Sequence, residues 1–385
     1  MLEKDLRNLV SGIMNIENKK LNILVISNIN PNKGIGPYYS IRNQTYYLSK
    51  TQNVIWYNLN ETSDEYWEET GIYYNALKFP NKTIKDLKEP FNKPDFIIFQ
   101  GIYEYKFGKI IKEAIKFKIP YIIVPRSSLT KGAQNQKRIK KIIANKFIYN
   151  KLIRKASAIQ YLTNEEKEQS GNKWNKNSFV MPNGIISKTK VTRNYNKEFV
   201  KGLFIGRLDM NHKGLDLLIT SVKNNKKILL ENNYEIHLYG PEAKNTPIKL
   251  IKELIKEDKL EKIIKIYGPI YEEEKYKKLK EYDFFIMTSR FEGHPMGLIE
   301  ALSFSLPVFI TRGTNMYEEV KTYDAGWVCE NNIESITKQI KVMISQKKEF
   351  KNKSENAYKL SKIYTWEDLT IETDSVIRKI KRGNK

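Results

Sequence analysis

Two glutamates separated by seven residues, Glu292 and Glu300, have the type and spacing that best suit a binding site in this sequence. The apolar run Phe284–Ser289 predicts a buried parallel strand before them, and Gly293 and Pro295 predict the loop that follows. Glu292 then lies on this loop and Glu300 in the next helix. Such loops line the crevice at the carboxyl ends of parallel strands, where ligands bind. Because a carboxylate can accept two hydroxyl hydrogen bonds, the pair suits a sugar or a ribose, with two solvated glutamates as the alternative interpretation.

Two cations, Arg207 and Lys213, flank a second predicted strand-to-helix turn. The strand Gly202–Ile205 runs into Gly206 and Arg207, and Lys213 begins the next helix. Cations beside a helix N-terminus suit a diphosphate, because the free backbone amides there add partial positive charge. Basic residues are common in loops, so this pair alone would be weak evidence.

The string from Glu292 to Glu300, E-G-H-P-M-G-L-I-E, resembles the E-x7-E signature of retaining GT-B glycosyltransferases of glycosyltransferase family four. The resemblance implies a catalytic Glu292 that contacts the donor hexose and a Glu300 that binds the ribose of the nucleotide. It implies transfer of a hexose from a nucleotide-diphosphate sugar, more often a UDP sugar in this family, to an acceptor hydroxyl with retention at the anomeric carbon. The acceptor it favours is a lipid-linked glycan in cell-surface polysaccharide or capsule synthesis.

Further strings resemble the same family. G-R-L…H-K-G matches its second signature, which assigns the donor diphosphate to Arg207 and Lys213. Arg126, at the end of the predicted strand Tyr121–Ser128, resembles a P-R-G motif and is the candidate acceptor residue. The other donor-binding residues that the resemblance implies, including a glycine loop after the first strand, are Gly34, Gly36, Gly206, Ile270, His294, Pro295, Met296 and Gly297.

Gln100 departs from the family pattern. It ends the predicted strand Pro94–Gly101, where many relatives carry a histidine near the transferred sugar. A glutamine cannot titrate near neutral pH, but its amide can donate to one sugar hydroxyl and accept from another. We therefore expect Gln100 to take part in catalysis by contacting donor or acceptor, with capping of the strand end as the alternative.

The order of the predicted elements gives the fold class. Strands and helices alternate along the chain, which favours an α/β fold. The resemblance implies GT-B architecture, with two Rossmann-like domains facing across a central cleft. It divides the chain into an acceptor-side domain over 1–190, a nucleotide-sugar-binding domain over 198–362, and a final helix over 363–385 that crosses back to the first domain.

The composition limits the classes of protein. The 385 residues include one cysteine and three scattered histidines, which argues against a disulfide framework or a zinc site. No D-x-D pair is present, so we expect neither a metal nor another cofactor. No run approaches the roughly 20 apolar residues of a membrane span. The first residues predict a short amphipathic helix through Leu2, Leu6, Leu9 and Ile13 rather than a signal peptide.

The net charge of +23 is concentrated in one region. Residues 101–155 hold 15 basic and 2 acidic residues, and 133–155 predicts a basic amphipathic helix. We expect its apolar face to pack on the sheet. Its basic face is then either solvated or in contact with an anionic membrane surface. The second interpretation places the protein in the cytoplasm, peripheral at the inner face of the cell membrane.

Two other classes of function stay open. The chain could be a catalytically silent, glycosyltransferase-like partner subunit, although the intact residues named above argue against this. It could also be a basic nucleic-acid-binding protein, but no RNP, KH or zinc-finger pattern supports that class, and we expect no nucleic acid partner.

Overall fold

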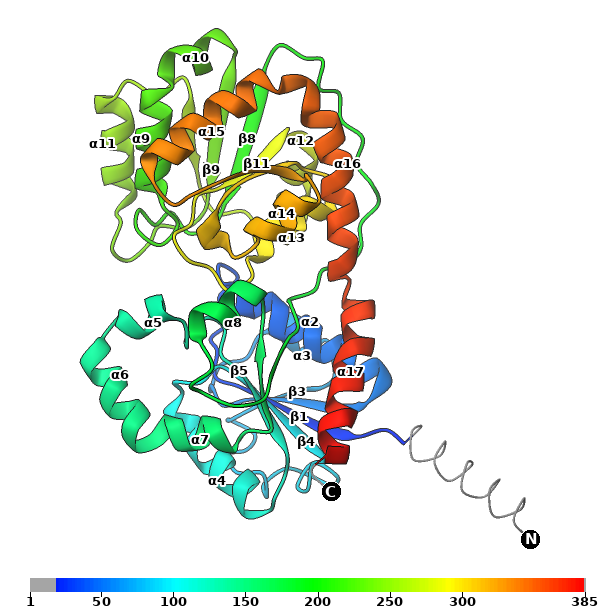
Figure 1. Cartoon of the computed structure of the whole chain (residues 1–385). Coiled ribbons are helices and arrows are strands. Elements are labelled where there is room, and N and C mark those ends of the chain that lie inside the picture. The colour runs from blue at the N-terminus through cyan, green and yellow to red at the C-terminus, as the bar shows by residue number, and fades with distance from the viewer. Residues whose placement is uncertain (1–18, 384–385) are drawn as a thin grey trace.

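The computed structural model describes residues 19–383, so the helix expected through Leu2, Leu6, Leu9 and Ile13 lies outside the described residues. Figure 1 shows two α/β units, one above the other, each with a parallel sheet and helices around it. The α/β prediction with two Rossmann-like domains is confirmed.

The first sheet has seven parallel strands in the order β3-β2-β1-β4-β5-β6-β7. The strands are β1 (Asn22–Ser27), β2 (Asn53–Asn58), β3 (Tyr73–Asn75), β4 (Phe96–Gln100), β5 (Tyr121–Val124), β6 (Ala158–Tyr161) and β7 (Ser178–Val180). The helices between them are α2 (Gly36–Thr51), α3 (Glu65–Glu68), η1 (Tyr105–Phe107), α4 (Gly108–Lys116), α5 (Lys131–Asn135), α6 (Arg138–Ala144), the π-helix η2 (Asn145–Tyr149), α7 (Asn150–Lys155) and α8 (Asn164–Ser170).

The second sheet has six parallel strands in the order β10-β9-β8-β11-β12-β13. They are β8 (Val200–Ile205), β9 (Tyr234–Tyr239), β10 (Ile264–Tyr267), β11 (Phe284–Met287), β12 (Val308–Thr311) and β13 (Gly326–Cys329). The helices are α9 (Leu215–Asn224), α10 (Lys226–Glu231), α11 (Ile248–Glu257), α12 (Glu272–Glu281), α13 (Met296–Ser303), η3 (Arg312–Thr314), α14 (Tyr317–Thr322), α15 (Ile333–Ser345), η4 (Lys347–Glu349), α16 (Phe350–Ser361), η5 (Lys362–Tyr364) and α17 (Trp366–Gly383).

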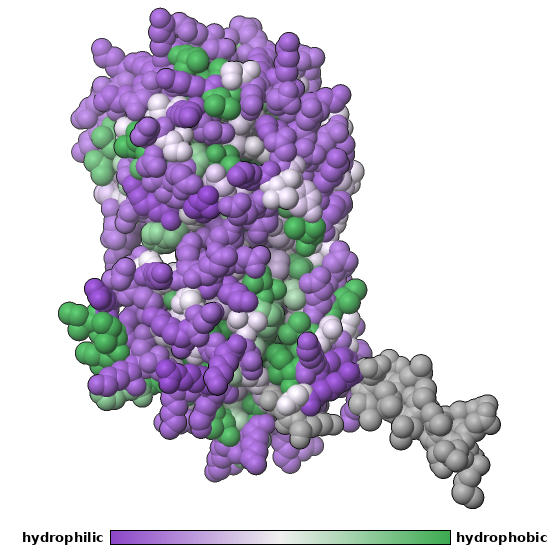
Figure 2. Space-filling view, in the orientation of Figure 1, coloured by the Kyte–Doolittle hydropathy of each residue, from purple (hydrophilic) through white to green (hydrophobic). Residues whose placement is uncertain are grey.

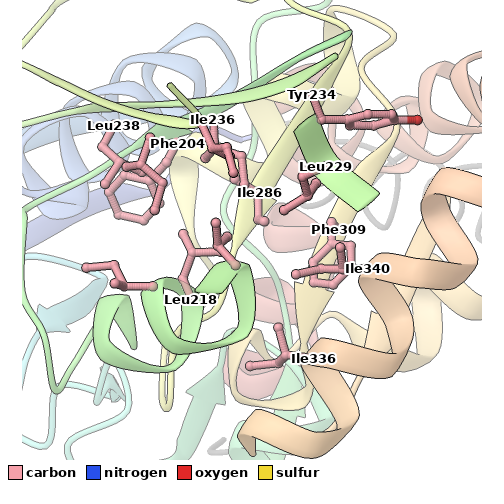
Figure 3. Close-up of a cluster of buried hydrophobic side chains, with 14 of the residues drawn as sticks. Phe204, Leu218, Leu229, Tyr234, Ile236, Leu238, Ile286, Phe309, Ile336 and Ile340 are labelled. Atoms are coloured by element: carbon pink, nitrogen blue, oxygen red, sulfur yellow. The ribbon is translucent and has the colours of Figure 1, made fainter. Parts of the chain in front are cut away.

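Strand β11 is buried on both faces. Alternate side chains of a strand point to opposite faces, so Phe284 and Ile286 join the cluster under α9 and α15 that Figure 3 shows. Phe285 and Met287 join a different cluster on the opposite face of the sheet. A strand fixed from both sides is a rigid support for the loop that carries Glu292.

The chain returns to the first domain at its C-terminal end. Helix α17 lies beside α2, as Figure 1 shows. The Ile185 amide donates to the carbonyl of Tyr364 (2.7 Å), and the Trp366 amide donates back to Ile185 (3.1 Å). At Gly184 a Cβ atom would meet the Trp366 ring at 2.4 Å, so the turn and the ring are in close contact. The domain limits 1–190, 198–362 and 363–385 stay a prediction.

Gly214 joins the Lys213 turn to the end of β11. It has a φ of +64° and precedes α9. The Thr288 hydroxyl donates to its carbonyl at 3.0 Å. A Cβ atom at Gly214 would lie 2.1 Å from the Thr288 carbonyl oxygen, which leaves no room for a side chain.

We expect Gly214→Ala to lower the free energy of unfolding by roughly 1–3 kcal/mol, because alanine meets both the left-handed backbone and the Thr288 carbonyl. Urea unfolding followed by circular dichroism measures the loss. Gly132→Ala is the matched control, since nothing lies within 4 Å of its Cβ position in α5. Equal stability of the two variants would contradict the constraint at Gly214.

Candidate active site

A cavity of about 300 Å³ lies between the two domains, at the carboxyl ends of strands from both sheets. It brings together every site residue that the sequence predicts except Gln100. Those that line it are Gly34, Gly36, Arg126, Gly206, Arg207, Lys213, Ile270, Glu292, His294, Pro295, Met296, Gly297 and Glu300.

Glu292 lies on the loop after β11 and is paired with a cation. Its Oε1 accepts from Lys213 Nζ at 2.5 Å and from the Ser289 hydroxyl at 2.7 Å. The Lys213 and Glu292 side chains are only 13% and 10% exposed. Burial raises the pKa of Glu292, but the Lys213 charge, His212 and these hydrogen bonds together hold the pKa below its ordinary value of 4.5. The carboxylate is therefore ionised at neutral pH.

The Glu292 loop also contacts the first domain. The Ser127 hydroxyl donates to the backbone carbonyl of Glu292 at 3.1 Å, and Asn315 Nδ2 donates to the same carbonyl at 2.5 Å. A Cβ atom at Gly293 would lie 3.0 Å from the Ser127 hydroxyl. The small residue at this position allows the loop and the first domain to approach closely.

Glu300 has a lysine partner that sequence reasoning missed. Its Oε1 accepts from Lys275 Nζ of α12 at 2.8 Å. The Lys275 ammonium also lies 4.9 Å from the centre of the Tyr39 ring in α2 of the first domain. Lys275 is buried although α12 is a run of lysines and glutamates, so no sequence signal separated it from solvated neighbours.

Arg207 and the helix N-termini leave positive charge at the cavity. The Arg207 side chain is 44% exposed and pairs with Asp209 at 3.3 Å. The first residues of α2 and α13, Gly36 and Met296, line the cavity, so their helix N-termini open onto it. A helix N-terminus carries about half a positive charge. This arrangement suits an anion.

His294 is a neutral hydrogen-bond donor in the cavity wall. Its Nδ1 accepts from the Asn183 amide at 3.2 Å, which places the ring proton on Nε2. Burial lowers the pKa of His294 to about 3, so the ring stays neutral. Asn183 Nδ2 also donates to the His294 carbonyl at 3.0 Å. Among the described residues no side chain or carbonyl accepts from His294 Nε2.

Gln100 is not among the residues that line the cavity, and its expected contact with donor or acceptor stays a prediction. Its Oε1 accepts from Arg126 Nη2 at 2.8 Å and Nε at 3.1 Å, and its amide donates to Gln44 at 2.8 Å. The Gln100 side chain at the end of β4 is therefore held by the Arg126 guanidinium. Gln100 positions Arg126, which does line the cavity.

Arg126 itself lies on an unusual turn. Arg126 and Ser127 have φ values of +50° and +66°. Burial lowers the pKa of Arg126 to about 10, with the nearby Glu166 carboxylate acting against that shift, so the guanidinium remains charged at neutral pH. Left-handed backbone at non-glycine residues is uncommon and costs free energy. The turn holds a cation at the first domain's side of the cavity.

His212 is a second residue without a sequence-based assignment, although it belongs to the H-K-G string. It lines the cavity, and its ring lies edge-on to Phe291 at 4.5 Å. Burial lowers the pKa of His212, and the Glu292 carboxylate only partly opposes that shift. The ring is thus neutral beside the Glu292–Lys213 pair.

The family model and the two similar proteins found by comparison are all described as glycosyltransferases. Residues 187–360 match the family model described as Glycosyl transferases group 1. An uncharacterized glycosyltransferase of Methanocaldococcus jannaschii is 24% identical over 262 residues, which are 68% of each chain. An uncharacterized glycosyltransferase of Haemophilus influenzae is 26% identical over 221 residues, which are 56% of this chain and 60% of that one.

Solved structures agree in fold. Sucrose-phosphate synthase from Thermosynechococcus elongatus is 13% identical, with a TM-score of 0.71 over 94% of this chain and 100% of that chain. Anabaena HepE, solved in complex with UDP, is also 13% identical, with a TM-score of 0.72 over 93% and 100% of the two chains. The fold is GT-B, and the matches support a glycosyltransferase.

The Glu292–Lys213 pair makes stability depend on pH in a defined way. In Lys213→Met the ionised Glu292 is buried without its cation, which should lower the free energy of unfolding by about 3–5 kcal/mol near neutral pH. Without the Lys213 charge, burial dominates and raises the pKa of Glu292 above 4.5. The deficit relative to wild type should therefore shrink as pH falls from about 7 to 4.5, because the carboxyl becomes protonated.

Thermal and urea unfolding at several pH values measure this deficit. Lys223→Met is the control, because the Lys223 side chain is 55% exposed in its pair with Asp258 and such pairs contribute little. The double variant Lys213→Met/Glu292→Gln should recover most of the loss. A deficit that does not change with pH would show that Lys213 stabilises the fold by packing alone.

Proposed function

We propose that the chain is a retaining GT-B glycosyltransferase of glycosyltransferase family four that moves a hexose from a nucleotide-diphosphate sugar to a hydroxyl of a glycan acceptor. The observation that carries the proposal is one cavity that holds Glu292, Glu300, Arg207 and Lys213 together. The structures of Anabaena HepE include complexes with UDP and with UDP-glucose, which favours a UDP sugar as the donor.

In this proposal each part of the donor has its own partner. The diphosphate binds Arg207, Lys213 and the N-terminus of α13, because an anion is stabilised by cations and free amides together. Glu300 accepts from the ribose hydroxyls, and the base lies near Ile270. Glu292 contacts the hexose, and the backbone amides of 294–297 face its oxygens. The glycine loop at Gly34 and Gly36 approaches the phosphates from the first domain.

The chemical step is mainly positioning and electrostatic stabilisation. The leaving diphosphate gains negative charge as the glycosidic bond breaks, and fixed cations in a partly buried site stabilise that charge. Among the described residues nothing accepts from His294 Nε2–H, so it can donate to an oxygen of the sugar donor. Because burial lowers the pKa of the ring to about 3, the ring stays neutral and carries this single N–H over the whole working range. No side chain is assigned as a covalent nucleophile.

The acceptor enters from the first domain, where Arg126 lines the cavity. We propose a lipid-linked glycan at the inner face of the cell membrane, in capsule or other cell-surface polysaccharide synthesis. In the described part of the chain, no helix has the length and apolar character needed to cross a bilayer. Gln100 acts in this proposal by holding the Arg126 guanidinium.

A catalytically silent partner subunit is the second candidate function. Such a subunit would not need both carboxylates to be paired with largely buried lysines, as Glu292 and Glu300 are here with Lys213 and Lys275. Slow hydrolysis of a nucleotide sugar by the purified chain alone distinguishes the two, since a silent subunit releases no nucleoside diphosphate. A salt-sensitive gel shift with nucleic acid tests the remaining alternative.

Titration with UDP and with inorganic pyrophosphate distinguishes the proposed role of Arg207, which binds the diphosphate, from that of Glu300, which binds the ribose. We expect Arg207→Met to weaken binding of both UDP and inorganic pyrophosphate by about 1.5–3 kcal/mol, the range for hydrogen bonds to charged groups. Glu300→Gln should weaken UDP but leave pyrophosphate unchanged, because only UDP has a ribose. Isothermal titration calorimetry measures both affinities.

Arg312→Met is the matched control for these titrations. Arg312 is similarly exposed and paired, but it does not line the cavity. The assignment of the diphosphate is wrong if Arg207→Met and Lys213→Ala both bind pyrophosphate as wild type does. The assignment of the ribose is wrong if Glu300→Gln loses both ligands equally.

Transfer should not require a divalent cation, because Arg207, Lys213 and the α13 N-terminus already meet the charge of the leaving diphosphate. Hydrolysis or transfer rates measured after dialysis against EDTA should equal those of the untreated protein. Loss of activity that manganese restores would refute this prediction.

A further inference from the structure

The helix of the basic region exposes its apolar residues. Five large apolar side chains of α6 and η2 are each between 53% and 75% exposed, and they are Ile139, Ile142, Ile143, Phe147 and Ile148. Figure 2 shows a hydrophobic patch at the edge of the first domain where Figure 1 places α6. The expectation that this apolar face packs on the sheet is therefore wrong.

The face of this helix that meets the protein is largely polar, apart from Tyr149 at the end of η2, which packs against the core of the first domain. Asn145 is buried, and its side chain accepts from the Tyr103 hydroxyl at 2.9 Å and donates to Gln134 at 3.0 Å. Lys141, one turn earlier, donates to the Ala133 carbonyl at 2.5 Å and lies 5.2 Å from the centre of the Tyr103 ring. Hydrogen bonds thus orient the helix with its apolar side outward, against the usual arrangement of a surface helix.

Cations surround the apolar patch. The sequence has no aspartate or glutamate between Glu113 and Glu165. The exposed basic residues on α6, η2 and α7 and just before α6 are Lys137, Arg138, Lys140, Lys146, Lys151, Arg154 and Lys155. An exposed apolar patch with a cationic border fits a surface that is anionic outside and apolar beneath.

We propose that α6 and η2, residues 138–149, form a membrane-docking surface whose apolar side chains insert among the acyl chains of an anionic bilayer. Isoleucine and phenylalanine gain by leaving water, and the lysines and arginines remain at the level of the headgroups. A nucleic acid would use the cations but offers no apolar layer for five aliphatic and aromatic side chains. The purpose of this docking surface rests on the proposed function, since docking would bring the cleft to a lipid-linked acceptor.

Flotation of the full chain with vesicles of phosphatidylcholine, with and without phosphatidylglycerol, tests the surface. We expect binding to the anionic vesicles and at least tenfold weaker partitioning of Ile142→Ser/Phe147→Ser, because two inserted side chains are lost. Ile371→Ser/Leu77→Ser is the matched control, since these apolar residues are equally exposed elsewhere. Raised salt should weaken binding of wild type only in part, because the apolar contribution is not screened.

A fluorescent reporter measures insertion directly. All five native tryptophans are buried, so Phe147→Trp adds the one exposed indole among the described residues. Its emission should shift to shorter wavelength on anionic vesicles and be quenched by brominated acyl chains. Binding without quenching would mean that only the charges touch the lipid, and it would overturn the insertion.

Other results would also overturn the proposal. If Ile142→Ser/Phe147→Ser and its control Ile371→Ser/Leu77→Ser partition equally onto anionic vesicles, the apolar patch does not mediate binding. Self-association of wild type that this variant abolishes, without vesicle binding, would instead assign the patch to a second copy of the chain. Hydrolysis of a nucleotide sugar by Ile142→Ser/Phe147→Ser should equal that of wild type, so a failure of the docking surface and a failure of the proposed activity are distinguishable.

Discussion

The buried ion pair between Glu292 and Lys213 is the constraint on which the site depends. Two charges removed from water are tolerated only if they meet in good geometry, and here they come from loops after two different strands, β11 and β8. The left-handed Gly214 and its contact with Thr288 fix one loop. Gly313 fixes the other, since a Cβ atom there would lie 2.3 Å from the Arg290 carbonyl oxygen. Much of the local backbone therefore serves to bring these two side chains to one place.

The second carboxylate, Glu300, is likewise held in a largely buried ion pair, with Lys275. In both pairs a single carboxylate oxygen accepts from the lysine, so further lone pairs remain for hydroxyl groups. An ammonium likewise has three N–H groups, and Lys213 can donate to an anion while it keeps Glu292. Polyhydroxylated and anionic groups can then bind by adding hydrogen bonds instead of breaking the ion pairs. A site built this way is already ordered before a ligand arrives, which lowers the cost of binding.

The sequence predicts what is local and periodic. The strand before Glu292, the loop and α13 follow from apolar runs and turn residues within a short segment, and the parallel sheets follow from their alternation with helices. Lys275 could not be found, because its burial results from packing against Tyr39, far away in the chain. Gln100 was placed at the right strand end, but only the fold shows that it binds Arg126, which lines the cavity. For α6, the spacing of the apolar residues shows which of them share one face of the helix. It does not show whether that face points toward the protein or toward solvent.

The contacts between the domains explain how the first domain can influence a cavity whose lining lies mostly on the second. Ser127 and Asn183 both bind backbone of the loop 292–294, and Gln169 of α8 donates to Asn315, which holds the same loop. These are single hydrogen bonds between buried or partly buried groups, each worth only about 0.5–1.5 kcal/mol. The Lys33–Glu272 pair across the cleft is exposed and therefore contributes little. Because these bonds reach the backbone carbonyl of the residue whose carboxylate lines the cavity, any shift of the first domain relative to the second would also move Glu292.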